Sequence, residues 1–318
     1  MRITRLAPSP TGALHLGNAR TFLMNWLLAV DGGWRIILRI EDLDGPRVKS
    51  GADKQAIEDL KWLGLTWDEG PIYQSTRKTI YDAAIEKLIA GGGAYPCICS
   101  RSEAEDASSA PHAEDGSAVY PGTCRGRFAT MEEARAAAGA RGPCVRFAVE
   151  DGVVEFQDMF RGRQLVDVGR LGDFVIAKSD GSAAYHLAVV VDDAEMNVTD
   201  VVRGDDLVES AGRQILLNRA LGLENRIPRY WHLPLVVGAD GRRLAKRHGD
   251  TRIDFYRQRG VEAGRVLALL AKWCGIEAGE EMSAAELRGK LDLERVARRA
   301  INFTERDDAF LLGGERKR

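Results

Sequence analysis

The stretch Arg5-Leu-Ala-Pro-Ser-Pro-Thr-Gly-Ala-Leu-His-Leu-Gly-Asn-Ala-Arg20 decides the fold that this sequence predicts. An apolar strand covers residues 3–7 and ends at Pro8 and Pro10, because a proline ring cannot donate to a strand ladder. From Asn18 onward apolar residues recur at helical spacing, namely Ala19, Phe22, Leu23, Trp26, Leu27 and Val30. The stretch therefore predicts a strand, a tight turn rich in glycine and proline, and a helix whose N-terminus faces that turn.

This turn is a candidate binding site for phosphate. The first N–H groups of a helix lack partners within the helix, and the positive end of its dipole attracts anions. His15 lies in the turn, where a compact donor would contact a bound phosphate. The pattern by itself also fits a polar residue in an ordinary loop, so both interpretations stay open at this point.

Length, composition and charge set broader limits. A chain of 318 residues with 45% apolar content can bury a large core and is expected to form two domains. The net charge of −2 indicates no partner, but residues 242–318 carry 18 basic and 13 acidic side chains, which favours an RNA-facing surface there. No apolar run is long enough to span a bilayer. The odd count of 5 cysteines fits a reducing cytoplasm and a metal site better than a disulfide framework.

Three cysteines are spaced like metal ligands. They are Cys97, Cys99 and Cys124. Two thiols separated by one residue can bind one ion and a third can help to close the site, but tetrahedral zinc needs a fourth ligand. Soft-ligand preference favours His112 over Tyr120, whereas residues 103–118 around His112 have the composition of a low-complexity insert. The remaining thiols, Cys144 and Cys274, are expected to be ordinary buried ones.

Charged residues follow two predicted strands. The strand at 36–40 runs into an acidic cluster that begins with Glu41, and a later strand runs into Arg203. Because ligands bind at the carboxyl ends of strands in open α/β sheets, both residues are expected to face one crevice. A guanidinium there suits a carboxylate ligand. An ion pair with Asp205 or Asp206 explains Arg203 equally well from the residues alone.

Hydrophobic periodicity assigns the other elements. Strands are expected at 174–176, 187–191, 198–202 and 230–237, with antiparallel strands between 144 and 172. Helices are expected near 53–63, 75–90, 208–221, 262–274, 283–290 and 292–300. In this assignment His186 lies on a strand beside Tyr185 and has a structural role. A basic loop at 242–250, taken alone, would be a solvated surface loop.

Taken together, these motifs resemble the class I aminoacyl-tRNA synthetases, and specifically their glutamyl branch. His15-Leu-Gly-Asn18 is similar to the "HIGH" signature, with Asn in place of the second His. Arg243-Leu-Ala-Lys-Arg247 is similar to the "KMSKS" loop, with Arg for the first Lys and Ala for Ser. The block Asp192-Asp193…Thr199-Asp-Val-Val-Arg-Gly-Asp-Asp206 is a further specific match. The resemblance covers roughly residues 2–250.

The resemblance implies an α/β fold with a Rossmann-type parallel sheet, a β-rich zinc-containing insert and a small α-helical C-terminal appendage. Residues 1–96 and 170–241 would form the split catalytic domain, and residues 97–169 the insert that touches the RNA acceptor end. Residues 242–318 would hold the phosphate-clamp loop and the helical appendage, without an anticodon-binding domain.

The resemblance also implies roles for individual residues. His15 and Lys246 would be catalytic, and ATP with its Mg²⁺ would be bound by His15, Gly17, Asn18 and Lys246. L-Glutamate would be bound by Arg5, Ser9, Glu41, Tyr185 and Arg203. In that set Glu41 would hold the amino group, and the two arginines would read the side-chain carboxylate. One structural zinc ion would be bound by Cys97, Cys99, Tyr120 and Cys124, with the tyrosine oxygen as the fourth ligand.

The glutamyl branch contains a short paralogue group without the anticodon-binding region of the full-length enzymes. Its members activate glutamate with ATP in the absence of tRNA and transfer it to the queuosine base in the anticodon of tRNA(Asp). The length of this chain and its Cys-x-Cys…Tyr-x-x-x-Cys spacing favour that group, acting as a monomer without membrane contact. The alternatives are a truncated glutamyl-tRNA synthetase that charges tRNA(Glu), and a non-catalytic regulator that binds RNA or an adenylate.

Overall fold

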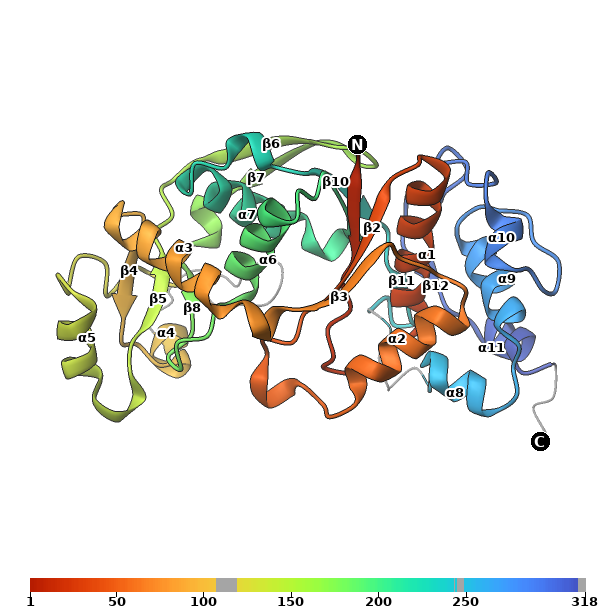
Figure 1. The fold of residues 1–318 in the computed structure, drawn as a ribbon, viewed down its shortest axis with the longest axis horizontal. Coiled ribbons are helices and arrows are strands. Elements are labelled where there is room, and N and C mark those ends of the chain that lie inside the picture. The colour runs from red at the N-terminus through yellow and green to blue at the C-terminus, as the bar shows by residue number, and fades with distance from the viewer. Residues whose placement is uncertain (107–118, 243, 245–248, 314–318) are drawn as a thin grey trace.

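The computed structural model describes residues 1–106, 119–242, 244 and 249–313 (Figure 1). In the view of Figure 1 the N-terminal sheet stands near the middle, α4 and α5 lie on the left, and the C-terminal helices lie on the right. No helix in these ranges is both long enough and apolar enough to cross a membrane.

A parallel sheet carries the candidate site. β1 (Ile3–Leu6) pairs with β2 (Arg35–Ile40), which pairs with β3 (Glu69–Tyr73). β9 (Asp200–Gly204) pairs with β10 (Arg229–Leu233) and lies beside β1, where the Thr199 N–H donates to the Ile3 carbonyl at 2.8 Å. Because these strands run in parallel, their carboxyl ends share one edge. The predicted Rossmann-type α/β fold is confirmed.

Helices pack on this sheet and connect its strands. They are α1 (Leu16–Asp31), α2 (Ala52–Trp62), α3 (Lys78–Ala90), α6 (Tyr185–Glu195) and α7 (Val208–Ala220). The face of α1 formed by Leu16, Leu23 and Leu27 is fully buried in the main hydrophobic core. This packing fixes the N-terminus of α1 at the edge where the parallel strands end.

A β-rich segment interrupts the parallel sheet. β4 (Ala94–Cys97), β5 (Cys144–Phe147) and β8 (Phe174–Ala177) form an antiparallel sheet, accompanied by α4 (Arg101–Asp106) and α5 (Met131–Ala138). The hairpin of β6 (Val153–Asp158) and β7 (Gly162–Asp167) joins β10 through a pairing of Asp158 with Tyr230. The predicted antiparallel strands between residues 144 and 172 are therefore confirmed.

The strand expected at residues 187–191 is wrong, because these residues lie in α6. The run Leu-Ala-Val-Val-Val is buried throughout, so no polar face reveals a helical period. Continuous apolar runs fit a buried strand or a buried helix equally, and the β-branched valines favoured the strand. His186 consequently lies on a helix and not on a strand.

The described C-terminal segment contains two helices that the sequence did not predict, α8 (Ile253–Gln258) and α11 (Glu305–Leu311), and lacks one that it did. It also contains α9 (Ala263–Trp273) and the short α10 (Ala284–Leu287). The helix expected at 292–300 is absent from this described segment, since the chain returns in turns to β12 (Ile301–Asn302) and pairs with β11 (Val236–Val237). A chain in turns spans a longer distance per residue than a helix does, so residues 292–300 reach β11 in this form. The last strand expected at 230–237 is split at Pro234, which has no N–H to donate.

α2 contains a buried carboxylate with an incomplete set of partners. Asp59 is 0% exposed; its Oδ1 accepts from Gln55 at 2.8 Å, and its Oδ2 has no partner among the described residues. Burial raises the pKa of Asp59 from 3.8 to about 6. The hydrogen bond from Gln55 opposes this increase, and the negative charge of Asp254 adds to it. The native state therefore binds this proton more tightly than the unfolded state, and its stability falls as the pH rises from about 4 to 6.

We expect Asp59→Asn to stabilise the fold by about 1–3 kcal/mol near neutral pH, because the amide never has to bury a charge. Chemical denaturation at about pH 7.5 and again at about pH 4 measures the change. The gain should disappear at the lower pH, where the native carboxyl is protonated. The exposed Glu86→Gln on α3 is the matched control. Equal gains at both pH values would contradict the explanation.

Candidate functional site

A cavity of about 530 Å³ opens at the carboxyl ends of β1, β2 and β9. Its volume lies within the range of small-ligand sites. Its lining includes Arg5, Ser9, His15, Gly17, Asn18, Glu41, Tyr185 and Arg203. These are the residues assigned from the sequence to glutamate and ATP, with one exception. Lys246 lies outside the described residues, as do Arg243 and Arg247 of the same loop.

His15 caps α1. Its Nδ1 accepts hydrogen bonds from the backbone N–H groups of Gly17 at 3.2 Å and Asn18 at 3.4 Å. The neutral ring must then carry its proton on Nε2. Two of the helix N–H groups expected to face a phosphate are thus satisfied by the histidine.

The same turn is tied to the segment that follows the basic loop. The Leu16 N–H donates to the Thr251 carbonyl at 2.9 Å, and the Ile253 N–H donates to the Leu14 carbonyl at 2.8 Å. These two bonds flank His15. The turn and the start of α8 therefore form one local unit.

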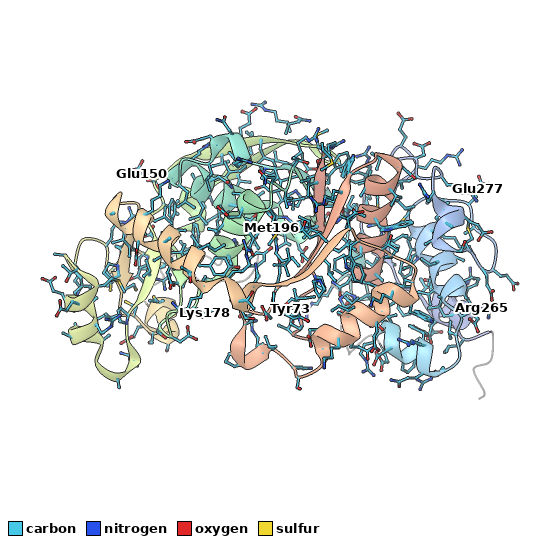
Figure 2. All side chains as sticks on the ribbon, viewed as in Figure 1. Tyr73, Glu150, Lys178, Met196, Arg265 and Glu277 are labelled. Atoms are coloured by element: carbon cyan, nitrogen blue, oxygen red, sulfur yellow. The ribbon has the colours of Figure 1, made fainter. Side chains whose placement is uncertain are left out.

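A buried ion cluster lies behind the cavity wall. Arg39 is fully buried; its Nη1 donates to Asp193 Oδ1 at 2.6 Å and its Nη2 to Glu41 Oε1 at 3.2 Å. Its Nη1 also lies 3.8 Å from the sulfur of Met196, which Figure 2 labels. Burial alone would lower the pKa of Arg39, but the charges of Asp193 and Glu41 raise it. The arginine orients Glu41, whose own pKa is raised by burial against the attraction of Arg39 and Arg5.

Arg5 has few partners for a buried cation. It is 5% exposed and its Nε lies 3.6 Å from Asp193 Oδ1, which is an ion pair without a hydrogen bond. No hydrogen bond joins its guanidinium to another side chain within residues 1–106, 119–242, 244 and 249–313. A buried guanidinium with free N–H groups at a cavity wall is suited to an anionic ligand.

Arg203 is held by neutral acceptors. It donates from Nε to His232 Nε2 at 3.0 Å, from Nη1 to Gln214 Oε1 at 2.9 Å, and from Nη2 to the Leu207 carbonyl at 3.2 Å. The alternative ion pair does not form with Asp205, which pairs with Arg161 at 2.8 Å. The charge of Arg203 thus remains available to the cavity.

Sequence reasoning missed Arg39, Asp193 and His232. Asp193 was part of a matching block but received no role, and His232 lay in the last strand without a function. A signal existed for Arg39, because a charged residue in the middle of an apolar strand needs a buried partner. The partner itself is 154 positions away in the chain, where local patterns cannot identify it.

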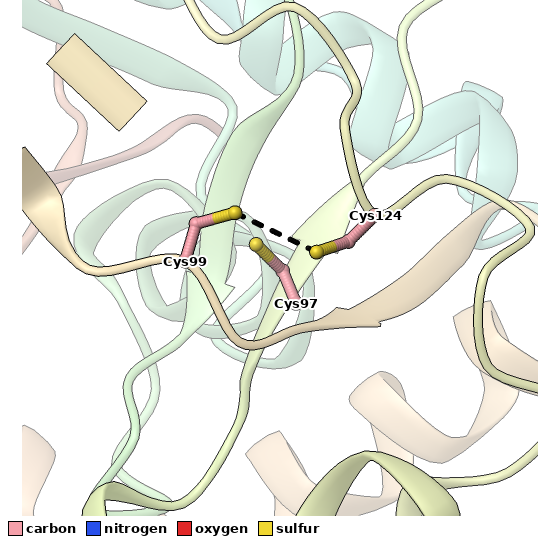
Figure 3. Close-up of side chains that lie close together, drawn as sticks. All are labelled: Cys97, Cys99 and Cys124. Atoms are coloured by element: carbon pink, nitrogen blue, oxygen red, sulfur yellow. Dashed lines mark hydrogen bonds between the residues drawn. The ribbon is translucent and has the colours of Figure 1, made fainter. Parts of the chain in front are cut away.

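Three thiols converge in the β-rich segment (Figure 3). The sulfurs of Cys97, Cys99 and Cys124 lie within 4.8 Å of one another, and the Cys99 and Cys124 sulfurs are 3.6 Å apart. The Tyr120 hydroxyl is 3.3 Å from the sulfurs of both Cys97 and Cys99. His112, the other candidate ligand, lies outside the described residues.

Cys144 is not the ordinary buried thiol that was expected. It is half-buried and stands directly opposite Cys97 in the pairing of β4 with β5. A hydrogen bond from Cys144 lowers the pKa of Cys97 to about 4, with help from Tyr120 and Arg146 and against the effect of burial. Cys97 therefore favours the thiolate, whereas burial raises the pKa of Cys99 to about 11. Cys274 is fully buried at the end of α9.

Comparisons with known proteins agree with this geometry. The family model for the catalytic domain of tRNA synthetases class I (E and Q) matches residues 2–306. A glutamyl-Q tRNA(Asp) synthetase from Symbiobacterium thermophilum is 46% identical over 98% of this chain and 98% of its own length. A glutamate–tRNA ligase from Citrifermentans bemidjiense is 42% identical over 94% of this chain, but over 63% of its own length.

The fold is also similar to that of a solved glutamate tRNA ligase. The crystal structure of a glutamate tRNA ligase from Elizabethkingia meningosepticum in complex with its amino acid superposes with a TM-score of 0.80. The two proteins are 28% identical, and the match covers 98% of this chain and 68% of that one. The extent of these matches shows that the chain belongs to the family of class I tRNA synthetases whose catalytic domain is of the E and Q type.

Proposed function

We propose that this enzyme activates L-glutamate with ATP, without tRNA, and transfers the glutamate to queuosine in the anticodon of tRNA(Asp). The observation that carries the proposal is the pair of buried guanidinium groups, Arg5 and Arg203, at the wall of one cavity. Neither makes a hydrogen bond to a carboxylate within the described part of the chain. Such a pair suits an acidic substrate.

The proposed pocket distinguishes glutamate from glutamine. Two arginines would bind the side-chain carboxylate of glutamate, whereas the amide of glutamine would place N–H donors against N–H donors. Glu41, oriented by Arg39, would bind the substrate ammonium. Ser9 and Tyr185 would complete the lining of this end.

The other end of the cavity would hold ATP. The Nε2–H of His15, with Gly17 and Asn18 at the start of α1, would contact the phosphates, and Lys246 would clamp the β- and γ-phosphates. Mg²⁺ carried with ATP would neutralise phosphate charge. The ionised α-carboxylate would attack the α-phosphorus, and the bond to the β-phosphate oxygen would break to release pyrophosphate. Alignment and charge neutralisation supply the catalysis, with no general base required.

The acceptor is inferred from the relatives. The Symbiobacterium relative matches along nearly its whole length and is named for Q-tRNA(Asp), and a second glutamyl-Q tRNA(Asp) synthetase, from Rhodopirellula baltica, is 44% identical over 89% of this chain and 88% of its own length. A nucleophile on the queuosine base would attack the adenylate carbonyl, and AMP would leave. The second candidate is charging of tRNA(Glu), which the matching glutamate–tRNA ligases support.

The cysteine cluster fits one zinc ion. Tetrahedral zinc with bonds of about 2.3 Å would place its sulfurs about 3.8 Å apart, close to the present separation of Cys99 and Cys124. Cys97, Cys99, Cys124 and the Tyr120 oxygen would hold it. Such an ion would join the end of β4 to the segment around Tyr120 and give the insert a structural cross-link.

We expect glutamate-dependent exchange between ATP and pyrophosphate in the absence of any RNA, since the residues proposed to bind glutamate all line one cavity of this chain. Labelled glutamate should then pass to tRNA(Asp) that contains queuosine and not to tRNA(Asp) that lacks it. Filter binding of radioactive glutamate measures the second step. Stable charging of tRNA(Glu), or exchange that depends on glutamine, would contradict the proposal.

We expect Arg5→Met to lower kcat/KM for glutamate at least about thirtyfold, because a buried carboxylate loses its cationic partner. The KM for ATP should stay close to the wild-type value. Steady-state exchange assays give both constants. Arg35→Met is the matched control, because Arg35 pairs with Glu69 on the exposed side of the sheet. An unchanged KM for glutamate in Arg5→Met would remove Arg5 from the pocket.

We expect the purified protein to contain about one zinc ion per chain, and Cys99→Ser to lose it, because a hydroxyl is a poor zinc ligand. Elemental analysis measures the content. Cys144→Ser should keep the metal, which separates the neighbouring thiol from the ligands. Loss in Tyr120→Phe but not in His112→Ala would assign the fourth ligand to the tyrosine, and the reverse would assign it to the histidine.

A further inference from the structure

We propose that His232 and Asp158 are positioning residues for Arg203, which they fix in the direction needed to bind the side-chain carboxylate of the substrate. The inference rests on the proposed role of Arg203 in the glutamate pocket. It adds two residues that lie behind the cavity wall and touch no substrate.

Arg203 is fixed on three sides. Its five N–H groups include three that donate to His232, Gln214 and the Leu207 carbonyl, at 2.9–3.2 Å. The guanidinium is 5% exposed, and the residue lines the cavity. The two remaining N–H groups are those that a ligand can use, and their direction follows from the other three.

The bond from Arg203 Nε–H requires a lone pair on His232 Nε2. A neutral imidazole offers that lone pair only when its proton is on Nδ1. Nδ1 lies 2.7 Å from Oδ2 of Asp158. This carboxylate oxygen accepts a hydrogen bond from the Nδ1–H. Nε2 also lies 3.1 Å from the Leu207 carbonyl, but that carbonyl already accepts from Arg203 Nη2 at 3.2 Å. Asp158 therefore selects the tautomer of His232, and the tautomer supplies the acceptor for Arg203.

Both groups keep the necessary charge states. His232 is fully buried, stacked on Tyr230 with ring centroids 5.8 Å apart, and burial lowers its pKa to about 4 with the help of Arg203 and against Asp158. Burial would raise the pKa of Asp158, but hydrogen bonds from His232 and from the Arg161 and Phe160 backbone lower it overall. At neutral pH the pair is thus a neutral imidazole and a carboxylate.

The substitution Asp158→Asn reverses the tautomer without changing the shape. Oδ1 of Asp158 accepts from the backbone N–H groups of Phe160 at 2.9 Å and Arg161 at 2.7 Å, so these donors hold the amide oxygen of the variant in the same place. The backbone N–H of His232 lies 3.1 Å from Oδ2 and 3.3 Å from Oδ1, so in the variant the amide oxygen at Oδ1 can keep this donor. The amide nitrogen must then face His232 Nδ1 and donate to it. The imidazole proton moves to Nε2, where it opposes the Nε–H of Arg203.

In Asp158→Asn we expect the KM for glutamate to rise about tenfold or more, the value for losing one hydrogen bond to a charged group. The KM for ATP should change less than about twofold, because the ATP end of the cavity is untouched. ¹⁵N spectra of the imidazole, assigned with His232→Gln, should show the proton on Nδ1 in the wild type and on Nε2 in the variant. Asp167→Asn on the exposed side of β7 is the matched control.

A double-mutant cycle with Arg203→Lys separates positioning from a general structural effect. If Asp158 acts through Arg203, its substitution should have little further effect on the KM for glutamate in the lysine background. Additive effects, an Nε2–H tautomer in the wild type, or a switched tautomer with an unchanged KM would each overturn the inference. A wild-type enzyme without glutamate-dependent exchange would instead contradict the proposed function, whatever the tautomer.

Discussion

The buried ion pair between Arg39 and Asp193 joins the two parts of the fold that the β-rich segment separates, at the edge where the parallel strands end. Arg39 is on β2 and Asp193 is on α6, 154 positions further along the chain. Neither charge is stable in the interior alone, because removal of one partner leaves an uncompensated buried ion. The pair therefore forms only when both parts are folded, and it places Glu41 and Arg5 at the same time.

The three arginines of this region differ in how the protein balances their charge. Arg39 is balanced by carboxylates in direct hydrogen bonds, whereas Arg203 is surrounded by neutral acceptors and Arg5 has one carboxylate beyond hydrogen-bond distance. Burial without an ion pair is unfavourable unless a ligand supplies the anion. The difference distinguishes an arginine whose charge is balanced within the protein from two whose N–H groups suit an anionic ligand. It is also the physical reason why an acidic amino acid suits this cavity.

Sequence patterns predicted the parts of the molecule that are determined locally. The Pro8–Gly17 turn, the strands around residues 3–7 and 36–40 and the start of α1 followed from proline, glycine and a clear change of period. α6 was assigned wrongly because its apolar run is buried on all sides and so has no visible period. The site residues came from a family resemblance, while Arg39, Asp193 and His232 depend on contacts between distant segments, which no local pattern encodes.

The place of β9 beside β1 also determines when the sheet can be completed. The Thr199 N–H donates to the Ile3 carbonyl, and the Ile3 N–H donates to the Thr199 hydroxyl. Arg2 also pairs with Asp200, so the partner of the first strand is made almost 200 residues after it. The β-rich segment lies between them and has its own antiparallel sheet, which can form from local pairings first. Contacts of such sequence separation form late, and until then one edge of β1 stays unpaired during synthesis. The turn around His15 that follows β1 thus acquires its final support only after β9 has been synthesised.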